Sequence, residues 1–129
     1  MKTLGELKAQ IENMVAQGNI LPELIPSFGK FTGPTAEVFI EGNKYHFTAY
    51  GNQTSTDNLE EFLYLIFQEL TKQMGHIYEV EHRNPKLDSR RIAFQRQLEI
   101  LESLNGDWKK RREKEIEELL HWYPYNDKE

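Results

Sequence analysis

The spacing of apolar and polar positions predicts a helix at the start of the chain. Thr3 and Glu6 have the spacing of a capping box, in which each side chain binds the backbone of the other residue. Gly18 is a suitable residue to end this helix. Residues 19–35 contain three prolines and two glycines, which predicts an irregular connection packed over the core. The apolar side chains of the helix recur at helical spacing: Leu4, Leu7, Ile11, Met14 and Val15.

Residues 36–50 predict a β-hairpin around the two-residue turn Gly42-Asn43. With that turn, Val38 lies opposite Phe47 and Ile40 lies opposite Tyr45. This register predicts an antiparallel sheet that is covered on one side, to which residues 53–55 add a short third strand. The apolar face of the hairpin consists of Val38, Ile40, Tyr45, Phe47 and Ala49. The opposite face carries Glu37, Phe39, Glu41, Lys44, His46 and Thr48.

Three more helices are predicted after the hairpin, over about residues 57–82, 88–104 and 107–122. The first of them is apolar nearly all round over residues 62–67, so we expect it to be the most buried. The apolar stripe of the second consists of Phe94, Leu98 and Leu101. The expected caps of the three helices are Asp57, Asp88 and Asp107.

Helices and strands are therefore segregated along the chain, which indicates an α+β fold. We expect an N-terminal helix, a small antiparallel β-meander, and then three helices packed on one sheet face. The length of 129 residues and the absence of a linker-like segment predict one domain over residues 1–129.

Composition excludes several kinds of site. The chain has no cysteine, so disulfides, thiolate metal sites and cysteine nucleophiles are impossible, which fits a cytoplasmic protein. Its longest apolar run is too short to cross a membrane, and its net charge of −5 is unlike that of a general nucleic-acid binder. We expect no cofactor, no membrane and no nucleic-acid partner; the oligomeric state is left open.

Two Glu-x-x-His pairs, Glu79 with His82 and Glu118 with His121, resemble the ligand pairs of di-iron bundles. Glu79 and the second pair face away from the apolar stripes of their helices, so we interpret both pairs as surface charges. The basic run over residues 109–112 is followed by glutamates at i+4, such as Lys109 with Glu113 and Lys114 with Glu118. This spacing favours a solvated, ion-paired helix over a DNA-binding face.

Arg91 falls on the apolar stripe of its predicted helix, where a guanidinium needs a partner. We interpret Arg90 and Arg91 as a structural clamp, with Asp57, Glu61 or Glu79 as the acceptor. The alternative is an anion or partner contact.

The polar face of the hairpin is a candidate partner-binding patch, because aromatic residues rimmed by charges are typical of interfaces. The alternative is that the N-terminal helix or residues 19–35 cover this face. No nucleophile elbow, P-loop or glycine-rich dinucleotide turn occurs, so we do not expect an enzyme. The candidate partner-binding residues are Glu37, Phe39, Glu41, His46 and Tyr50.

An ordered set of residues over about 28–127, densest after residue 54, resembles a known family. The matching positions are Tyr45, His46, Thr56, Asp57, Leu63, Tyr64, Phe67, Tyr78, Glu79, Arg83, Asp88, Arg90, Arg91, Phe94, Gln97, Leu101, Trp108 and Arg112. The sequence is similar to the immunity protein sixty-three family of bacterial polymorphic toxin systems. The resemblance implies a non-catalytic antidote that binds a cognate toxin.

Two other functions stay open at this point. One is a small ligand-binding domain or enzyme with a pocket near Tyr45, His46, Glu79 and Arg91. The other is a regulatory module that binds a host protein instead of a toxin.

Overall fold

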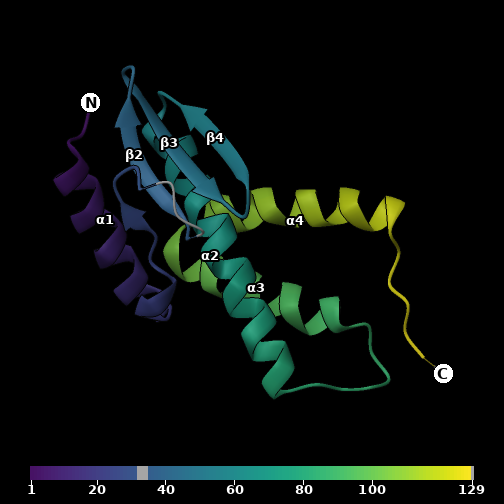
Figure 1. The fold of residues 1–129 in the computed structure, drawn as a ribbon. Coiled ribbons are helices and arrows are strands. Elements are labelled where there is room, and N and C mark those ends of the chain that lie inside the picture. The colour runs from purple at the N-terminus through teal and green to yellow at the C-terminus, as the bar shows by residue number, and fades with distance from the viewer. Residues whose placement is uncertain (32–34, 129) are drawn as a thin grey trace.

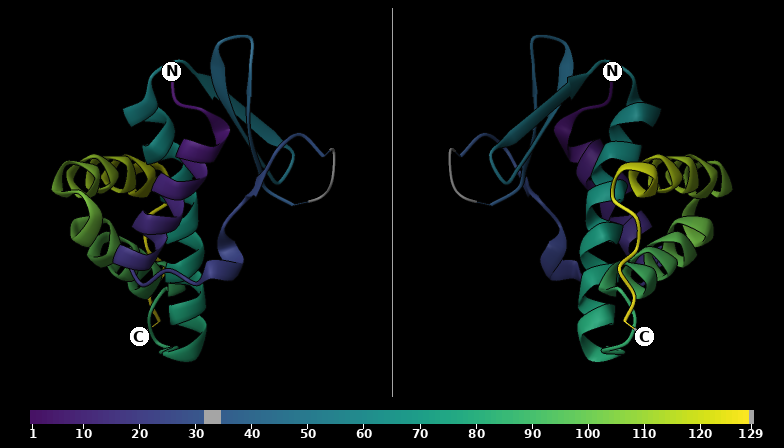
Figure 2. Two further views of the ribbon diagram at one scale, coloured as in Figure 1. Left: turned by 90° about the vertical axis from the view of Figure 1, so that its left-hand side faces the viewer. Right: turned by 90° about the vertical axis from the view of Figure 1, so that its right-hand side faces the viewer.

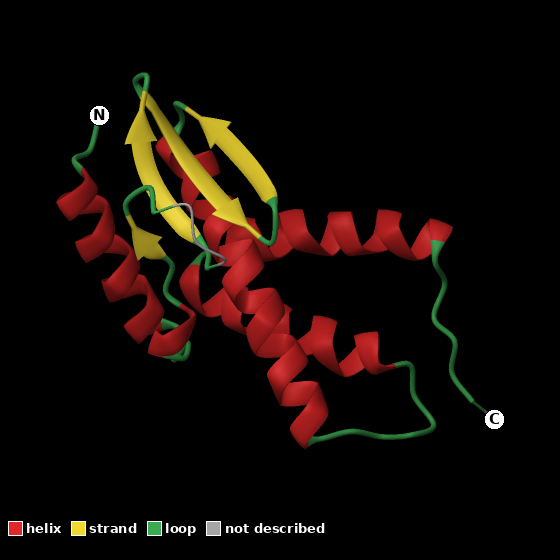
Figure 3. Ribbon diagram, in the orientation of Figure 1, coloured by secondary structure: helices red, strands yellow, loops and turns green. Residues whose placement is uncertain are grey.

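The computed structural model describes residues 1–31 and 35–128, and it confirms the α+β class (Figure 1). The strands gather at one end of the molecule, while the long helices fill the rest (Figure 3). The described elements are α1 (Leu4–Gln17), the 3-10 turn η1 (Pro22–Leu24), β1 (Ser27–Phe28), β2 (Glu37–Glu41), β3 (Lys44–Ala49), β4 (Asn52–Thr56), α2 (Leu59–Glu81), α3 (Ser89–Leu104) and α4 (Gly106–Trp122).

The described strands form a mixed sheet in the order β1-β2-β3-β4. The predicted hairpin register is confirmed, with Val38 opposite Phe47 and Ile40 opposite Tyr45. The third strand is also confirmed, as β4, which pairs antiparallel with β3. The predicted antiparallel meander is confirmed for β2, β3 and β4, but the sheet also contains β1, which the sequence did not predict and which pairs parallel with β2. The backbone N–H groups of Ser27 and Gly29 donate to the carbonyls of Ala36 and Val38 at 2.9 and 2.8 Å, and these bonds hold β1 beside β2.

Contrary to what the sequence led us to expect, the helices do not all pack on one face of the sheet. The sheet rests on α2 through β3 and β4, α3 packs against α2, and α4 packs against α3. Figure 2 shows the sheet standing to one side of the helices. Because the sheet and α3 both cover α2, this helix is buried nearly all round over residues 62–67, as its composition predicted. The N-terminal segment contacts both parts. The backbone N–H of Lys2, just before α1, donates to the hydroxyl of Tyr45 in the sheet, and the side chain of Gln17 at the end of α1 donates to the carbonyl of Ser103 in α3.

The helix caps are partly as expected. Thr3 forms the predicted capping box with Glu6, and Asp88 caps α3 by accepting from the backbone N–H of Arg90 at 2.9 Å. Two caps were wrongly assigned to aspartates. Asn58 caps α2 and Asn105 caps α4, each with its side-chain oxygen accepting backbone N–H groups of the first turn. Asparagine and aspartate cap equally well, so sequence alone does not choose between such close neighbours.

The buried side of α3 is also different from the prediction. Gln97, Ile100 and Leu101 are buried, whereas Phe94 and Leu98 are only partly covered. Gln97 donates from Nε2 to the carbonyl of Gln68 at 3.0 Å and to the hydroxyl of Thr71 at 3.2 Å. A polar side chain in the core is stable only when its hydrogen bonds are made, and here α2 supplies the acceptors.

Arg112 of α4 extends this buried network to a third helix. The residue is 8% exposed, and its Nε donates to Oε1 of Gln97 at 3.0 Å. Its Nη1 donates to Glu115 at 3.2 Å, and Glu115 also accepts the hydroxyl of Tyr64 at 2.6 Å. The set of Tyr64, Thr71, Gln97, Arg112 and Glu115, called here the interhelical polar network, therefore joins α2, α3 and α4.

The backbones of α2 and α3 approach each other closely at Gly75. A Cβ atom added there would lie 2.3 Å from the backbone oxygen of Ala93. The residue is buried, and no side chain fits between the two backbones without moving them apart. The α3-facing line of α2 thus carries small and polar residues at helical spacing: Gln68, Thr71, Gly75 and Glu79.

Candidate partner-binding site

The polar face of the hairpin is partly covered. Glu37 is 4% exposed and Phe39 is 6% exposed. The backbone N–H of Phe31 donates to Glu37 at 3.0 Å, and the ammonium of Lys30 lies 5.5 Å from the centre of the Phe39 ring. Residues 30–31 therefore lie against this face, as the alternative interpretation expected. The five predicted partner-binding residues do not form one open patch.

His46 is held in place from both neighbouring strands. Its ring stacks on Phe39, with centroids 4.8 Å apart and planes inclined by 9°. Its Nδ1 lies 2.7 Å from the hydroxyl of Ser55, and its Nε2 lies 2.8 Å from the carbonyl oxygen of Glu41. Both ring nitrogens have partners within the sheet, so the position of His46 is explained by its support of the sheet. The Glu41 side chain is exposed and pairs with Lys30 at 3.2 Å.

Tyr50 differs from these residues because most of its surface is exposed to solvent. It is 72% exposed and stands at the first position of the two-residue turn between β3 and β4. Its φ of +52° and the φ of +80° at Gly51 define a turn in which both residues are left-handed. That conformation is favourable for glycine and asparagine and costly for a bulky residue. An exposed tyrosine in a strained turn is a candidate contact residue.

A groove opens beside Tyr50, between the β3–β4 hairpin and α2. Its volume is about 680 Å³. The apolar floor is formed by Phe47 and Ala49 of the sheet and by Leu65 and Ile77 of α2. The polar rim on α2 consists of Gln68, Glu69, Lys72, Gln73 and His76, and on the hairpin of Tyr50, Asn52 and Thr54. Apolar concave surfaces with polar rims are typical of binding sites.

Sequence reasoning missed this groove. The alternation of the hairpin places Phe47 and Ala49 on the covered face. That face is not fully covered where these two residues line the groove. The groove exists because the sheet diverges from α2 toward the Tyr50 turn, and the angle between two elements leaves no local signal in the sequence. The one available signal was a bulky tyrosine directly before a glycine at a hairpin turn.

The family comparison bears directly on this region. The sequence model of the family described as Immunity protein 63 matches residues 42–118. The chain belongs to the Immunity protein 63 family. No curated protein and no solved structure matches it. The matched range begins at the Gly42 turn and contains β3, β4, α2, α3 and most of α4. The groove and the interhelical polar network both lie within the matched range.

The pocket expected near Tyr45, His46, Glu79 and Arg91 is not formed. Tyr45 is 3% exposed and stacks on Phe62 in the core, whereas His46 points to the other face of the sheet. Glu79 binds Arg83, and Arg91 binds Asp127 near the end of the chain. The four residues lie in different surroundings and do not converge on a common site.

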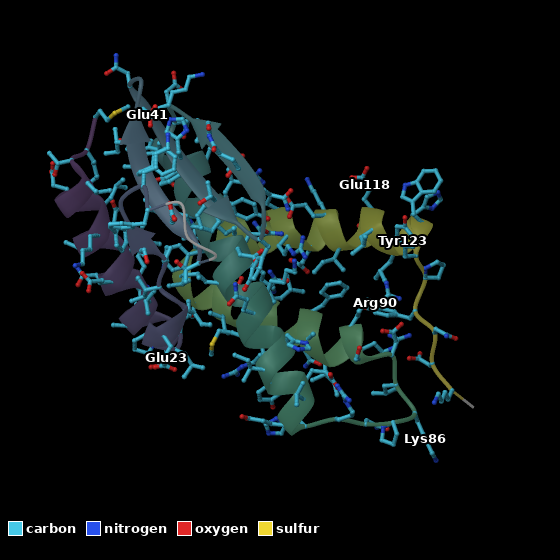
Figure 4. The ribbon with its side chains drawn as sticks, in the orientation of Figure 1. Glu23, Glu41, Lys86, Arg90, Glu118 and Tyr123 are labelled. Atoms are coloured by element: carbon cyan, nitrogen blue, oxygen red, sulfur yellow. The ribbon has the colours of Figure 1, made fainter. Side chains whose placement is uncertain are left out.

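The arginine clamp has other partners than those expected. Arg90 binds Asp88 at 2.8 Å and donates to the carbonyls of Tyr123 and Pro124, each at 2.8 Å. Figure 4 shows Arg90 between the start of α3 and Tyr123 at the end of α4. Arg91 binds Asp127 at 2.7 Å.

These two arginines fasten residues 123–127 to the start of α3, and the hydrogen bonds from Arg90 and Arg91 lower the pKa of Asp88 and of Asp127 respectively. The backbone N–H groups of Asn126 and Lys128 donate to Asp88 and to the carbonyl of Lys86, so residues 126–128 are tied to the segment before α3 as well.

The expected acceptors are engaged elsewhere. Glu61 pairs with Arg111 of α4 at 2.9 Å, and Glu79 pairs with Arg83 through two hydrogen bonds. Arg91 is exposed, so it faces the chain end instead of α2. Asp57 lies exposed just before α2.

Glu79 corrects another expectation, since it is 2% exposed although it faces away from the apolar stripe of its helix. It lies on the α3-facing line of α2, and the hydrogen bonds from Arg83 hold its pKa below the usual range. Glu118 is exposed and points away from the other helices (Figure 4). Within residues 1–31 and 35–128, no group of three histidine or acidic side chains is arranged to hold a metal ion.

Three of the four basic residues over 109–112 pair with carboxylates, but neither predicted i+4 pair, Lys109 with Glu113 or Lys114 with Glu118, is found among the ion pairs of the described residues. Lys109 pairs with Glu102, and Arg111 pairs with Glu61 and Glu115. The described helices include none with the length and apolar content needed to cross a membrane.

Proposed function

We propose that this chain is an immunity protein that neutralises a cognate bacterial toxin by binding to it directly in the cytoplasm. The observation that carries the proposal is the match of residues 42–118 to the Immunity protein 63 family. The action is inhibition by contact and needs a complementary surface, not a reactive site. The dispersion of Tyr45, His46, Glu79 and Arg91 is consistent with this interpretation.

The charge of the chain supports one kind of partner. A net charge of −5 favours encounter with a basic protein, because long-range attraction raises the rate of association. The exposed Tyr50 beside an apolar groove offers the aromatic anchor that interfaces commonly use. We expect toxin binding to weaken as the salt concentration rises.

Co-expression tests the proposal. Each toxin encoded beside this gene is expressed in a bacterial host with and without the chain, and survival is measured together with co-purification. We expect rescue by the wild-type chain and formation of a stable complex. Ile66→Asp is the matched negative control, because it places a charge at a fully buried position and should abolish folding and rescue together. Failure to rescue against every neighbouring toxin refutes the proposal.

A further inference from the structure

The edge of the sheet next to the groove is open. β4 is the last strand in the order β1-β2-β3-β4, and no described strand lies beyond it (Figure 1). Asn52, Thr54 and Thr56 lie opposite Ala49, Phe47 and Tyr45. In a hairpin with a two-residue turn, these are the pairs that exchange backbone hydrogen bonds. The backbone N–H and C=O groups of Gln53 and Ser55 therefore point outward, away from β3.

This edge also lacks the usual protection against strand pairing. Proteins commonly guard an edge strand with charged residues, proline or a bulge. The five residues of β4, NQTST, include no charge and no proline, and their pairing with β3 runs without interruption. All of them except Thr56 are exposed. The opposite edge, β1, has only two residues and offers much less backbone for pairing.

The edge and the groove form one continuous surface. Asn52 and Thr54 are on the side of β4 that lines the groove, whereas Gln53 and Ser55 are on the opposite face. Side chains of a β-strand alternate between the two faces of a sheet. A strand added to β4 would therefore place every second side chain into the groove, over the apolar floor formed by Phe47 and Leu65.

Charges at the end of the edge indicate the chemistry of that strand. β4 ends at Thr56, and Asp57 and Glu60 follow directly as exposed carboxylates. Together with the net charge of −5, they favour an incoming segment with basic residues at this end. A basic segment also suits the encounter with a basic toxin that the proposed function includes.

We infer that β4 is the docking edge for an extended segment of the toxin, which adds a strand to the sheet and inserts alternate apolar side chains into the groove. The inference rests on the proposed function and names how the toxin is held. Backbone hydrogen bonds supply affinity in such complexes, and the pockets for alternate side chains supply specificity. Tyr50 stands at the rim of the groove, where it closes over the added strand.

Two lysine substitutions at adjacent positions test this inference. Thr54→Lys places a charge at the mouth of the groove, and Gln53→Lys places the same charge on the opposite face of the same strand. Both positions are exposed, so both variants should fold, which thermal unfolding checks. With the neighbouring toxin that co-purifies with wild type, we expect Thr54→Lys to weaken binding by at least about tenfold and Gln53→Lys by less than about threefold.

Residue-resolved amide exchange gives a readout that does not depend on substitutions. In the free chain, the amides of Gln53 and Ser55 should exchange quickly, whereas that of Thr54 is protected by β3. In the complex, the first two should become protected. If wild type binds the toxin but these amides stay unprotected and the two lysine variants bind alike, the docking edge is refuted while the proposed function stands.

Two further outcomes are distinguishable. If no neighbouring toxin binds wild type, the proposed function fails and this inference fails with it. If sedimentation shows that the free wild-type chain dimerises and Thr54→Lys makes it monomeric, the edge pairs two copies of the chain, and the toxin segment is refuted as its occupant.

Discussion

Replacing Gly75 with alanine tests the close contact between the backbones of α2 and α3. The new Cβ would lie 2.3 Å from the backbone oxygen of Ala93, whereas ordinary carbon–oxygen contacts are about 3.3–3.6 Å. The two helices must then separate by about 1 Å. Overfilling a packed site costs about 1–3 kcal/mol, and the obstacle here is backbone that cannot rotate away. Alanine recovers about 1 kcal/mol through its better helix propensity. We expect a net loss of up to about 2 kcal/mol.

Gly5→Ala is the matched control. Gly5 is also in a helix, α1, but no atom lies within 4 Å of its added Cβ. The same substitution should therefore stabilise the protein, by up to about 1 kcal/mol. Urea unfolding at neutral pH measures both variants, and melting temperatures should shift by about 4 °C for each kcal/mol. If Gly75→Ala is as stable as Gly5→Ala, the close approach of α2 and α3 at this residue does not exist.

Three further predictions concern single side chains. Tyr64→Phe should cost about 1–2 kcal/mol in urea unfolding, because it removes the 2.6 Å hydrogen bond to Glu115; an unchanged stability would contradict the interhelical polar network. Asp88→Asn should destabilise most at neutral pH. The hydrogen bond from Arg90 lowers the pKa of Asp88 in the folded protein. The ionised Asp88 therefore adds to the free energy of unfolding above the pKa that this carboxyl has in the unfolded chain, about 4, and this stabilisation is lost as the pH falls further. Stability measured from pH 7 to pH 2 should therefore show the two proteins converging, and a constant difference would refute this reasoning. Tyr50→Asn should raise the melting temperature, because asparagine suits the left-handed turn, and should weaken toxin binding; equal binding would remove Tyr50 from the interface.

Locally determined features were predictable from the sequence. The hairpin register follows from alternation and a two-residue turn, and the structure confirms it residue by residue between Glu37 and Thr48. The extents of the helices follow from their apolar spacing within a few residues. The burial of α2 all round was predictable because a helix that is apolar on every side must be covered on every side.

Features that depend on how distant elements meet were not predictable. The buried side of α3 is centred on Gln97, a polar residue whose acceptors are on another helix. Arg91 and Asp127 are 36 positions apart, and the sequence around either residue contains no pattern that predicts their ion pair. Phe39 is covered because the connection after α1 places the ammonium group of Lys30 over its ring. The groove depends on the tilt of the sheet against α2, which no periodicity encodes.

The interhelical polar network has a mechanical consequence. Contacts between hydrocarbons tolerate sliding, but the hydrogen bonds from Arg112 and Gln97 have a fixed direction and length. Slipping α3 by one turn would take the Gln97 acceptor away from Nε of the buried Arg112 and would separate Gln97 from its own acceptors on α2, which is costlier than a poorer apolar fit. The relative positions of α2, α3 and α4 are therefore fixed by these hydrogen bonds. The conformational entropy lost on meeting a partner then comes from the hairpin and the partner, and hardly at all from the helices that support them.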